Sequence, residues 1–202
     1  MRSRVLVFQK RREQAAGFSL VELVVAMAVA LVLMAIGMPY FLRAFHAYQL
    51  TNSAYQLADI LRLTRYDAIR LNRNVSCVIN PDPLDSTMTD VFADENGDGI
   101  RGPNEEMIQL GNGGNLVGGG VPGAGGMLTS ANVTSATLTE GPGNATIQFD
   151  WRGAVNPATN VAVFYLASPT APDAGYRAVL LMPSGSIQVW TSDINGNWGQ
   201  LR

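Results

Sequence analysis

The sequence predicts an α+β fold in which one long N-terminal α-helix packs on a C-terminal antiparallel β-sheet head. Two observations indicate this fold. Twenty residues without a formal charge, Leu23 to Leu42, precede a helical pattern that reaches about residue 73. Beyond residue 74, short apolar runs alternate with Gly, Pro, Asn and Asp, which is typical of strands joined by turns. A chain of 202 residues can hold one such domain and a membrane segment.

The first 17 residues form a basic leader. They carry five basic residues and Glu13, a net charge of +4, whereas the rest of the chain holds nine Arg and fifteen acids, a net of −6. A basic head before an acidic body is typical of a targeting segment on an exported protein. The acidic body argues against a general polyanion binder, because affinity for nucleic acids comes mainly from clustered Lys and Arg.

Residues 18–42 are expected to form a transmembrane helix, since about 20 apolar residues span the hydrocarbon core of a bilayer. The basic residues precede the helix, so the positive-inside rule keeps residues 1–17 in the cytoplasm and sends the head outward. An ordinary signal peptide has its cleavage site after the apolar stretch. Here the small residues Ala15-Ala16-Gly17 come before it. Cleavage after Gly17 would therefore leave the helix on the mature chain.

Two residues are unusual for a membrane span. Glu22 puts a carboxylate early in the apolar run; such a charge costs roughly 2–3 kcal/mol or more in lipid and is functional by default. The alternative is a frayed interfacial helix end where Glu22 meets water. Pro39 removes one backbone hydrogen bond, and Gly37 weakens the same turn. We expect a kink there rather than a helix end at Met38, because the helical pattern resumes afterwards.

The stretch Gly17-Phe18-Ser19-Leu20-Val21-Glu22-Leu23 resembles the processing motif of type IV prepilins and of the pseudopilins of type II secretion. The resemblance implies that a prepilin peptidase cuts between Gly17 and Phe18 and N-methylates Phe18. It also implies that Glu22 pairs with the free amine of a neighbouring subunit's first residue. Pilin-like helices commonly carry a proline near the depth of Pro39. The mature chain would wait in the inner membrane, with its N-terminus cytoplasmic and its head periplasmic, before it enters a filament.

Residues 43–73 extend the helix with an amphipathic pattern. Apolar or small residues recur at spacings of four and three: Leu50, Ala54, Leu57, Leu61, Thr64, Ala68 and Leu71. This stripe is expected to pack against a sheet, and Asn72 or Asn74 to end the helix. The arginines off the stripe are expected to form a solvated face with local acid–base pairs rather than a phosphate-binding patch.

Residues 74–202 form the predicted head. Strands are expected near 75–79, 87–92, 106–110, 133–139, 145–151, 160–167, 176–182 and 186–191. Residues 111–126 hold nine glycines in sixteen positions, which predicts a mobile loop. Cys77 is expected to be a buried thiol, and His46 an interfacial residue past the membrane exit. With one cysteine and one histidine, the chain cannot form an internal disulfide, and it has too few ligands for a typical Cys/His metal site.

The layout of the head resembles the GspH/FimT family of minor pseudopilins and minor pilins. The likeness lies in residues 61–78, Phe149 to Gly153 and Val179 to Val189. DNA-binding members of the FimT branch carry Gly-Arg-x-Arg in the last hairpin. The matching stretch here is Gly185-Ser186-Ile187-Gln188, which has neither arginine. This departure argues against DNA as a partner.

Residues 94–105 satisfy the calcium-loop pattern D-x-N-x-D-G-x5-E. The side chains of Asp94, Asn96, Asp98 and Glu105 and the carbonyl of Ile100 would supply the oxygen ligands that calcium prefers. The flanks are predicted as strands rather than helices, however, and Pro103 lies inside the loop. A plain acidic turn between two strands is therefore the alternative. No other cofactor is expected.

The sequence favours a structural subunit over an enzyme, since it shows no convergent set of acid and base residues. We expect a minor subunit at or near the tip of a type II secretion pseudopilus or a type IV pilus, with roles in assembly and protein secretion. Its expected partners are prepilin peptidase, other major and minor pilins or pseudopilins, and inner-membrane lipid. The alternatives are a tip adhesin or cargo-recognition module using residues 111–126, a DNA-uptake minor pilin, and a membrane-anchored enzyme.

Overall fold

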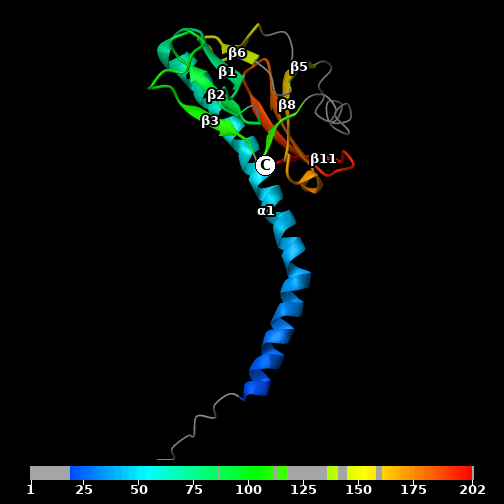
Figure 1. The fold of residues 1–202 in the computed structure, drawn as a ribbon. Helices are drawn as coiled ribbons and strands as arrows, with labels where there is room; N and C mark the ends of the chain where they lie inside the picture. Colours follow the sequence, from blue (N-terminus) through cyan, green and yellow to red (C-terminus); the bar gives the residue numbers. More distant parts are fainter. Residues whose placement is uncertain are drawn as a thin grey trace, which may run out of the picture. The chain divides into compact units, whose positions relative to one another are not determined.

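The computed structural model describes residues 19–85, 87–111, 113–117, 136–140, 145–157 and 161–201. The chain divides into two compact units between Tyr40 and Phe41. Helix α1 (Leu20–Leu71) begins in the first unit and continues into the second, which also holds every strand (Figure 1). The α+β class predicted from the sequence is confirmed.

The first unit consists of the apolar part of α1. Every described residue of this unit is exposed, and the stretch is long and apolar enough to cross a membrane. Pro39 lies inside the helix, so the helix does not end at Met38. Pro39 has no N–H to donate to the preceding turn, and a kink at this point stays a prediction.

The second part of α1 packs its predicted stripe against the head. Leu50, Leu57 and Leu61 are fully buried, as are the smaller members of the stripe, and only Leu71 stays half-buried. The helix ends where Asn72 adopts a positive φ of 50°. The Arg73 N–H then donates to the Ala68 carbonyl and the Asn72 N–H to the Ile69 carbonyl. These two bonds form the usual left-handed C-terminal cap, for which asparagine is a favoured residue after glycine.

The first sheet has five antiparallel strands in the order β3-β2-β1-β6-β7. Their bounds are β1 (Val75–Pro81), β2 (Thr89–Asp94), β3 (Met107–Leu110), β6 (Ala145–Phe149) and β7 (Val155–Asn156). Strand β1 is central, with Cys77 opposite Ala93 on one side and Ile147 on the other. The four longer strands confirm the predictions. Strand β6 ends earlier than expected, because Asp150 accepts hydrogen bonds from the backbone N–H groups of Arg152 and Ala154 and forms a turn.

The second sheet has the order β11-β10-β9-β8-β4, with β5 also paired to β8. The bounds are β4 (Asn115–Leu116), β5 (Ala136–Glu140), β8 (Val161–Ala167), β9 (Tyr176–Leu181), β10 (Ile187–Ser192) and β11 (Trp198–Leu201). Strand β5 runs parallel to β8, and this pair departs from the otherwise antiparallel pairing of the head. The chain between these strands passes through β6 and β7 of the first sheet. Parallel neighbours require such a crossover.

Four short elements were not expected from the sequence: strands β4, β7 and β11, and the 3-10 helix η1 (Pro172–Ala174). Strand β4 lies within residues 111–126, so the prediction of a loop is wrong at Asn115 and Leu116. Leu116 is buried and pairs with Leu166 of β8. The backbone at Gly114 approaches Leu50 so closely that a Cβ would lie 2.6 Å from its Cδ1 atom. Residues 118–135 lie outside the described part of the chain.

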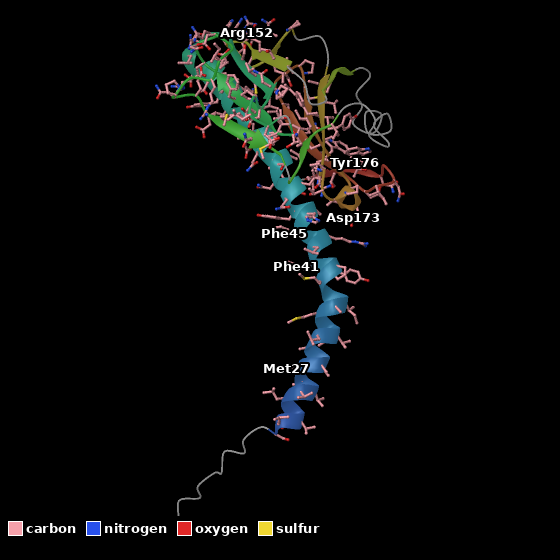
Figure 2. All side chains as sticks on the ribbon, in the orientation of Figure 1. Met27, Phe41, Phe45, Arg152, Asp173 and Tyr176 are labelled. Atoms are coloured by element: carbon pink, nitrogen blue, oxygen red, sulfur yellow. The ribbon has the colours of Figure 1, made fainter. Side chains whose placement is uncertain are left out.

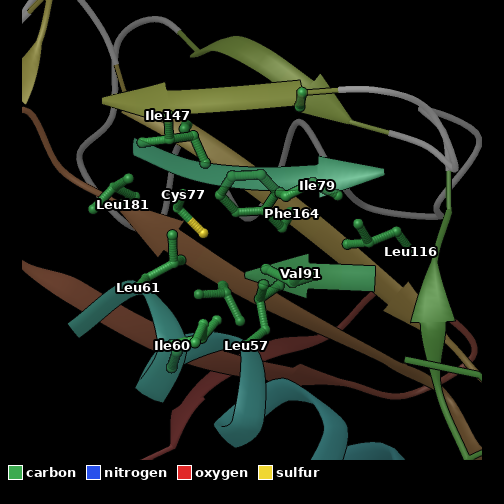
Figure 3. Close-up of a cluster of buried hydrophobic side chains, with 14 of the residues drawn as sticks. Leu57, Ile60, Leu61, Cys77, Ile79, Val91, Leu116, Ile147, Phe164 and Leu181 are labelled. Carbon is green, nitrogen blue, oxygen red and sulfur yellow. The ribbon is translucent and has the colours of Figure 1, made fainter. Parts of the chain in front are cut away.

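The core lies between the helix stripe and the inner faces of both sheets. Figure 3 shows Leu57 and Leu61 of α1 facing Cys77 of β1 and Phe164 of β8. A second cluster covers the opposite face of the second sheet and contains Tyr165, Leu180 and Trp190. Strand β8 is thus buried on both faces, which explains its unbroken apolar sequence. This double burial fixes the second sheet between two apolar layers.

Candidate functional site

The predicted processing site lies at the beginning of the chain. Gly17 and Phe18 are outside the described residues, which begin at Ser19. Glu22 lies in the first turn of α1 and is exposed. An acid in the first turn interacts favourably with the helix dipole, typically by about 0.3–1 kcal/mol. That is less than the roughly 2–3 kcal/mol that a carboxylate costs in lipid. A partner of opposite charge would offset this cost, and the pairing of Glu22 with a neighbouring subunit's amine stays a prediction.

The acidic loop between β2 and β3 is closed by hydrogen bonds to its own backbone. Asp94 accepts from the N–H of Gly97 at 2.7 Å and from the N–H of Gly99 at 3.0 Å. Glu105, which is buried, accepts from the N–H groups of Glu95 and Gly102. Both oxygens of each carboxylate are thus bonded to loop amides. The two acids together bond backbone amides from Glu95 to Gly102 and so fix the conformation of the loop.

The remaining candidate ligands bond locally. The Asn96 amide donates to Asp98 Oδ2, and its oxygen accepts from the Asp98 N–H. Asp98 Oδ1 accepts from the N–H of Ile100, whose side chain is exposed. Across the described part of the chain, no three acidic, histidine or thiol side chains come close enough together to hold one metal ion. The arrangement fits the acidic turn better than the calcium loop, and calcium binding stays a prediction.

The acidic loop is also attached to the end of α1. Arg70 lies 3.0 Å from Asp67, its helical neighbour, and 3.5 Å from Glu95 in the loop. Arg73 donates to the Glu95 carbonyl. The Asp67–Arg70 pair was expected from the spacing of three residues. The contacts with Glu95 could not be predicted from spacing, because Glu95 lies 25 residues from Arg70 in the sequence. They fix the loop on the helix end.

Two turns meet around Arg65. Its Nε donates to the Gly153 carbonyl at 2.9 Å, and a Cβ at Gly185 would clash with that same carbonyl oxygen. Gly185 has a φ of 78°, a conformation that glycine adopts at little cost. Gly185 lies in the β9–β10 turn, at the stretch that matches the arginine motif of the DNA-binding members of the FimT branch. Here the hairpin contacts an arginine from the helix instead.

Arg177 joins the second sheet to α1. Its buried guanidinium donates from Nε to Thr51 Oγ1 at 2.9 Å and from a terminal nitrogen to the Ala47 carbonyl at 3.3 Å. Burial lowers the pKa of Arg177. These acceptors are neutral helix oxygens that lie 126 and 130 residues away in the sequence. The available signal was a single arginine inside the apolar strand Tyr176–Leu181.

Cys77 is buried as the sequence predicted, whereas the interfacial position expected for His46 stays a prediction. Cys77 is fully buried, and this burial raises its pKa to about 12, although a side-chain hydrogen bond with Thr64 acts in the opposite direction. His46 is half-buried, with its ring centroid 6.3 Å from that of Phe45.

Comparison with known proteins supports the N-terminal assignment. Residues 13–38 match the family model described as the prokaryotic N-terminal methylation motif. Two crystal structures of the type IV minor pilin FimU from Pseudomonas aeruginosa, in space groups P65 and P21, are similar. They are 15% and 14% identical, with TM-scores of 0.42 and 0.43, over 69% and 70% of this chain and 91% and 88% of theirs. A comparison with curated protein sequences gives no significant match. The chain thus carries the prokaryotic N-terminal methylation motif at the beginning of an α+β fold, in which one long N-terminal helix packs on a β-sheet head.

Proposed function

We propose that the chain is a structural, non-catalytic minor subunit of a type IV pilus-like filament. The match of residues 13–38 to the N-terminal methylation motif carries this proposal. Helix α1 begins at Leu20, two residues after the proposed cleavage site. Processing after Gly17 would therefore remove the basic leader and leave the apolar helix as the anchor. The head would lie on the periplasmic side of the inner membrane until the subunit enters the filament.

Mass spectrometry of the mature N-terminus tests the processing step. We expect the chain to begin at Phe18 with one added methyl group on its amine. A Gly17→Leu variant should keep the leader, because a side chain at this position crowds the protease subsite. A Ser3→Leu change in the leader is the matched control and should leave cleavage unchanged. A mature chain that begins elsewhere, or an unmodified Phe18, would show that prepilin peptidase is not the processing enzyme.

Two filaments are candidates, the type II secretion pseudopilus and the type IV pilus. A clean gene deletion, scored in parallel for secreted proteins and for surface pili, separates them. Lost secretion with normal pili assigns the subunit to the pseudopilus, and lost pili with normal secretion assigns it to the pilus. If neither changes, a specialised tip adhesin becomes the leading function. That alternative rests on the glycine-rich sequence of residues 111–126, most of which lies outside the described part of the chain.

A further inference from the structure

The first turns of the second unit carry exposed aromatic side chains. Phe41, Phe45 and Tyr48 are 65%, 46% and 70% exposed, and the rings of Phe41 and Phe45 stack with centroids 6.4 Å apart. They begin where the uncharged run ends, at Leu42. At about 1.5 Å per residue, Tyr48 lies about 9 Å along the helix from Leu42. A headgroup layer is roughly 5–8 Å thick, and amphipathic aromatic rings gather there. These turns therefore cross the headgroup layer when the apolar run spans the membrane.

An ion pair joins this part of the helix to the head. Arg43 Nε lies 3.0 Å from Asp173 Oδ2, and the two side chains are 68% and 48% exposed. Asp173 belongs to η1, and Gly175 follows as the C-cap of this short helix. The backbone of Gly175 lies so close to β10 that a Cβ there would clash with the Ser192 carbonyl oxygen. Figure 2 shows Asp173 at the end of the head nearest Phe41 and Phe45 (Figure 2). A positive and a negative side chain are thus fixed side by side at headgroup depth.

We propose that Arg43 and Asp173 form a binding site for the headgroup of a zwitterionic aminophospholipid. The Arg43 guanidinium binds the lipid phosphate, and the Asp173 carboxylate accepts hydrogen bonds from the lipid ammonium group. Phe45 and Tyr48 follow Arg43 by two and five residues on another face of the same helix, and they mark the depth of the site in the membrane. The proposal requires only that α1 anchors the chain in a membrane, whichever filament the subunit joins.

The charges of the site favour this headgroup over two others. An anionic lipid without an amine would bind the Arg43 guanidinium through its phosphate, but its net negative charge would be repelled by the Asp173 carboxylate. A quaternary ammonium headgroup has the right charge but no N–H to donate. An exposed ion pair contributes little to stability by itself, so Arg43 and Asp173 can exchange their mutual contact for the two headgroup charges at small cost.

Native mass spectrometry of the mature full-length chain in detergent tests the site. Phosphatidylethanolamine, phosphatidylcholine and phosphatidylglycerol are added one at a time, and the apparent affinity of the first bound lipid is compared. We expect phosphatidylethanolamine to bind roughly fivefold or more tightly than the other two, since a charge-assisted hydrogen bond is worth about a factor of ten. Asp173→Asn should abolish this preference, whereas Arg43→Gln should weaken the binding of all three lipids, because each of them carries the phosphate.

The Asp59–Arg62 pair supplies the matched control, because it is another exposed ion pair on α1, at 2.6 Å. Arg62→Gln should leave lipid preference unchanged. Equal affinity for the three lipids, or the same loss in Arg62→Gln as in Arg43→Gln, would overturn the proposal. So would a lipid-free dimer in place of lipid adducts, which would show that the aromatic turns contact a second copy of the helix.

Discussion

Arg177 is a buried cation that joins strand β9 to α1 through neutral oxygens. An Arg177→Met substitution fills much of the same space but removes the hydrogen bonds to Thr51 and Ala47. We expect the free energy of unfolding to fall by about 2–3 kcal/mol, because the hydrogen bonds that the charged guanidinium donates are lost. Urea unfolding of the mature chain in detergent, followed by circular dichroism, measures this change.

Arg62→Met is the control for that experiment. Arg62 forms an exposed pair with Asp59 at 2.6 Å, and such pairs are worth about 0–1 kcal/mol. Equal losses in the two variants would contradict a connecting role for Arg177.

The buried thiol of Cys77 should make the free energy of unfolding depend on pH in the alkaline range. Burial raises its pKa to about 12 in the folded chain, whereas an exposed thiol titrates near about 8.5. Above that pH the unfolded chain releases the proton and the folded chain keeps it, so stability falls as pH rises. Up to pH 12 the loss from this group approaches about 1.4 kcal/mol per pH unit. Unfolding free energies at pH 8 and 10.5 measure it.

A Cys77→Ala variant isolates the thiol from the other groups that titrate in this range. Tyr165 also has a raised pKa, of about 12, and it is present in both chains. The variant should therefore lose less stability than the parent chain between the two pH values. Parallel curves for the two chains would show that Cys77 does not titrate on unfolding.

At the scale of elements, the β9–β10 turn depends on the absence of a side chain at Gly185. Gly185 and Gly97 have similar φ values of 78° and 81°. A Cβ at Gly185 would clash with the Gly153 carbonyl oxygen, whereas a Cβ at Gly97 would meet no atom within 4 Å. Gly97→Ala should cost about 1–2 kcal/mol, from backbone conformation alone. Gly185→Ala should cost roughly 2 kcal/mol more, because the turn must also move away from Arg65.

Thermal unfolding of the two glycine variants gives this comparison directly. The pair separates backbone strain from steric exclusion, since only the second differs between the positions. Equal melting temperatures would mean that the β9–β10 turn can leave Gly153 without loss, and that Arg65 does not hold the two turns together.

The acidic loop gives a second prediction at this scale. Its carboxylates already bond to loop amides, through Asp94 to Gly97 and Gly99 and through Glu105 to Glu95 and Gly102. We therefore expect calcium or a chelator to leave the melting temperature of the chain nearly unchanged. Glu105→Gln should lower it, because an amide offers only one acceptor oxygen for two N–H groups. A calcium-dependent rise that Asp98→Ala abolishes would restore the calcium loop.

At the scale of the whole molecule, the sequence predicted the features that depend on residues close together in the chain. The stripe from Leu50 to Ala68 follows from helical periodicity, and the helix ends at Asn72, one of the two stops that the sequence offered. Strand β4 and the parallel pairing of β5 with β8 could not be predicted, because both depend on where distant strands lie. The same holds for the candidate sites. The sequence left a calcium loop and a plain acidic turn open for Asp94 to Glu105, and it could not show which amides the carboxylates bind.

The apolar part of α1 carries one charge that bears on the proposed assembly of the whole molecule into a filament. Glu22 lies in the first turn of α1, and we propose that its carboxylate pairs with the methylated amine of a neighbouring subunit. Glu22→Gln keeps the shape but removes the charge, so insertion in the membrane should persist. Recovery of the subunit in sheared filaments should fall roughly tenfold or more, since loss of a buried ion-pair partner costs several kcal/mol.

Met27→Leu, an apolar change in the same helix, should leave recovery unchanged. Mass spectrometry of the mature N-terminus shows whether Glu22→Gln is still cut and methylated at Phe18. If it is, a fall in recovery reports the lost ion pair rather than failed processing. Normal recovery of Glu22→Gln would mean that Glu22 meets water at a frayed helix end and that another contact sets the register of the filament.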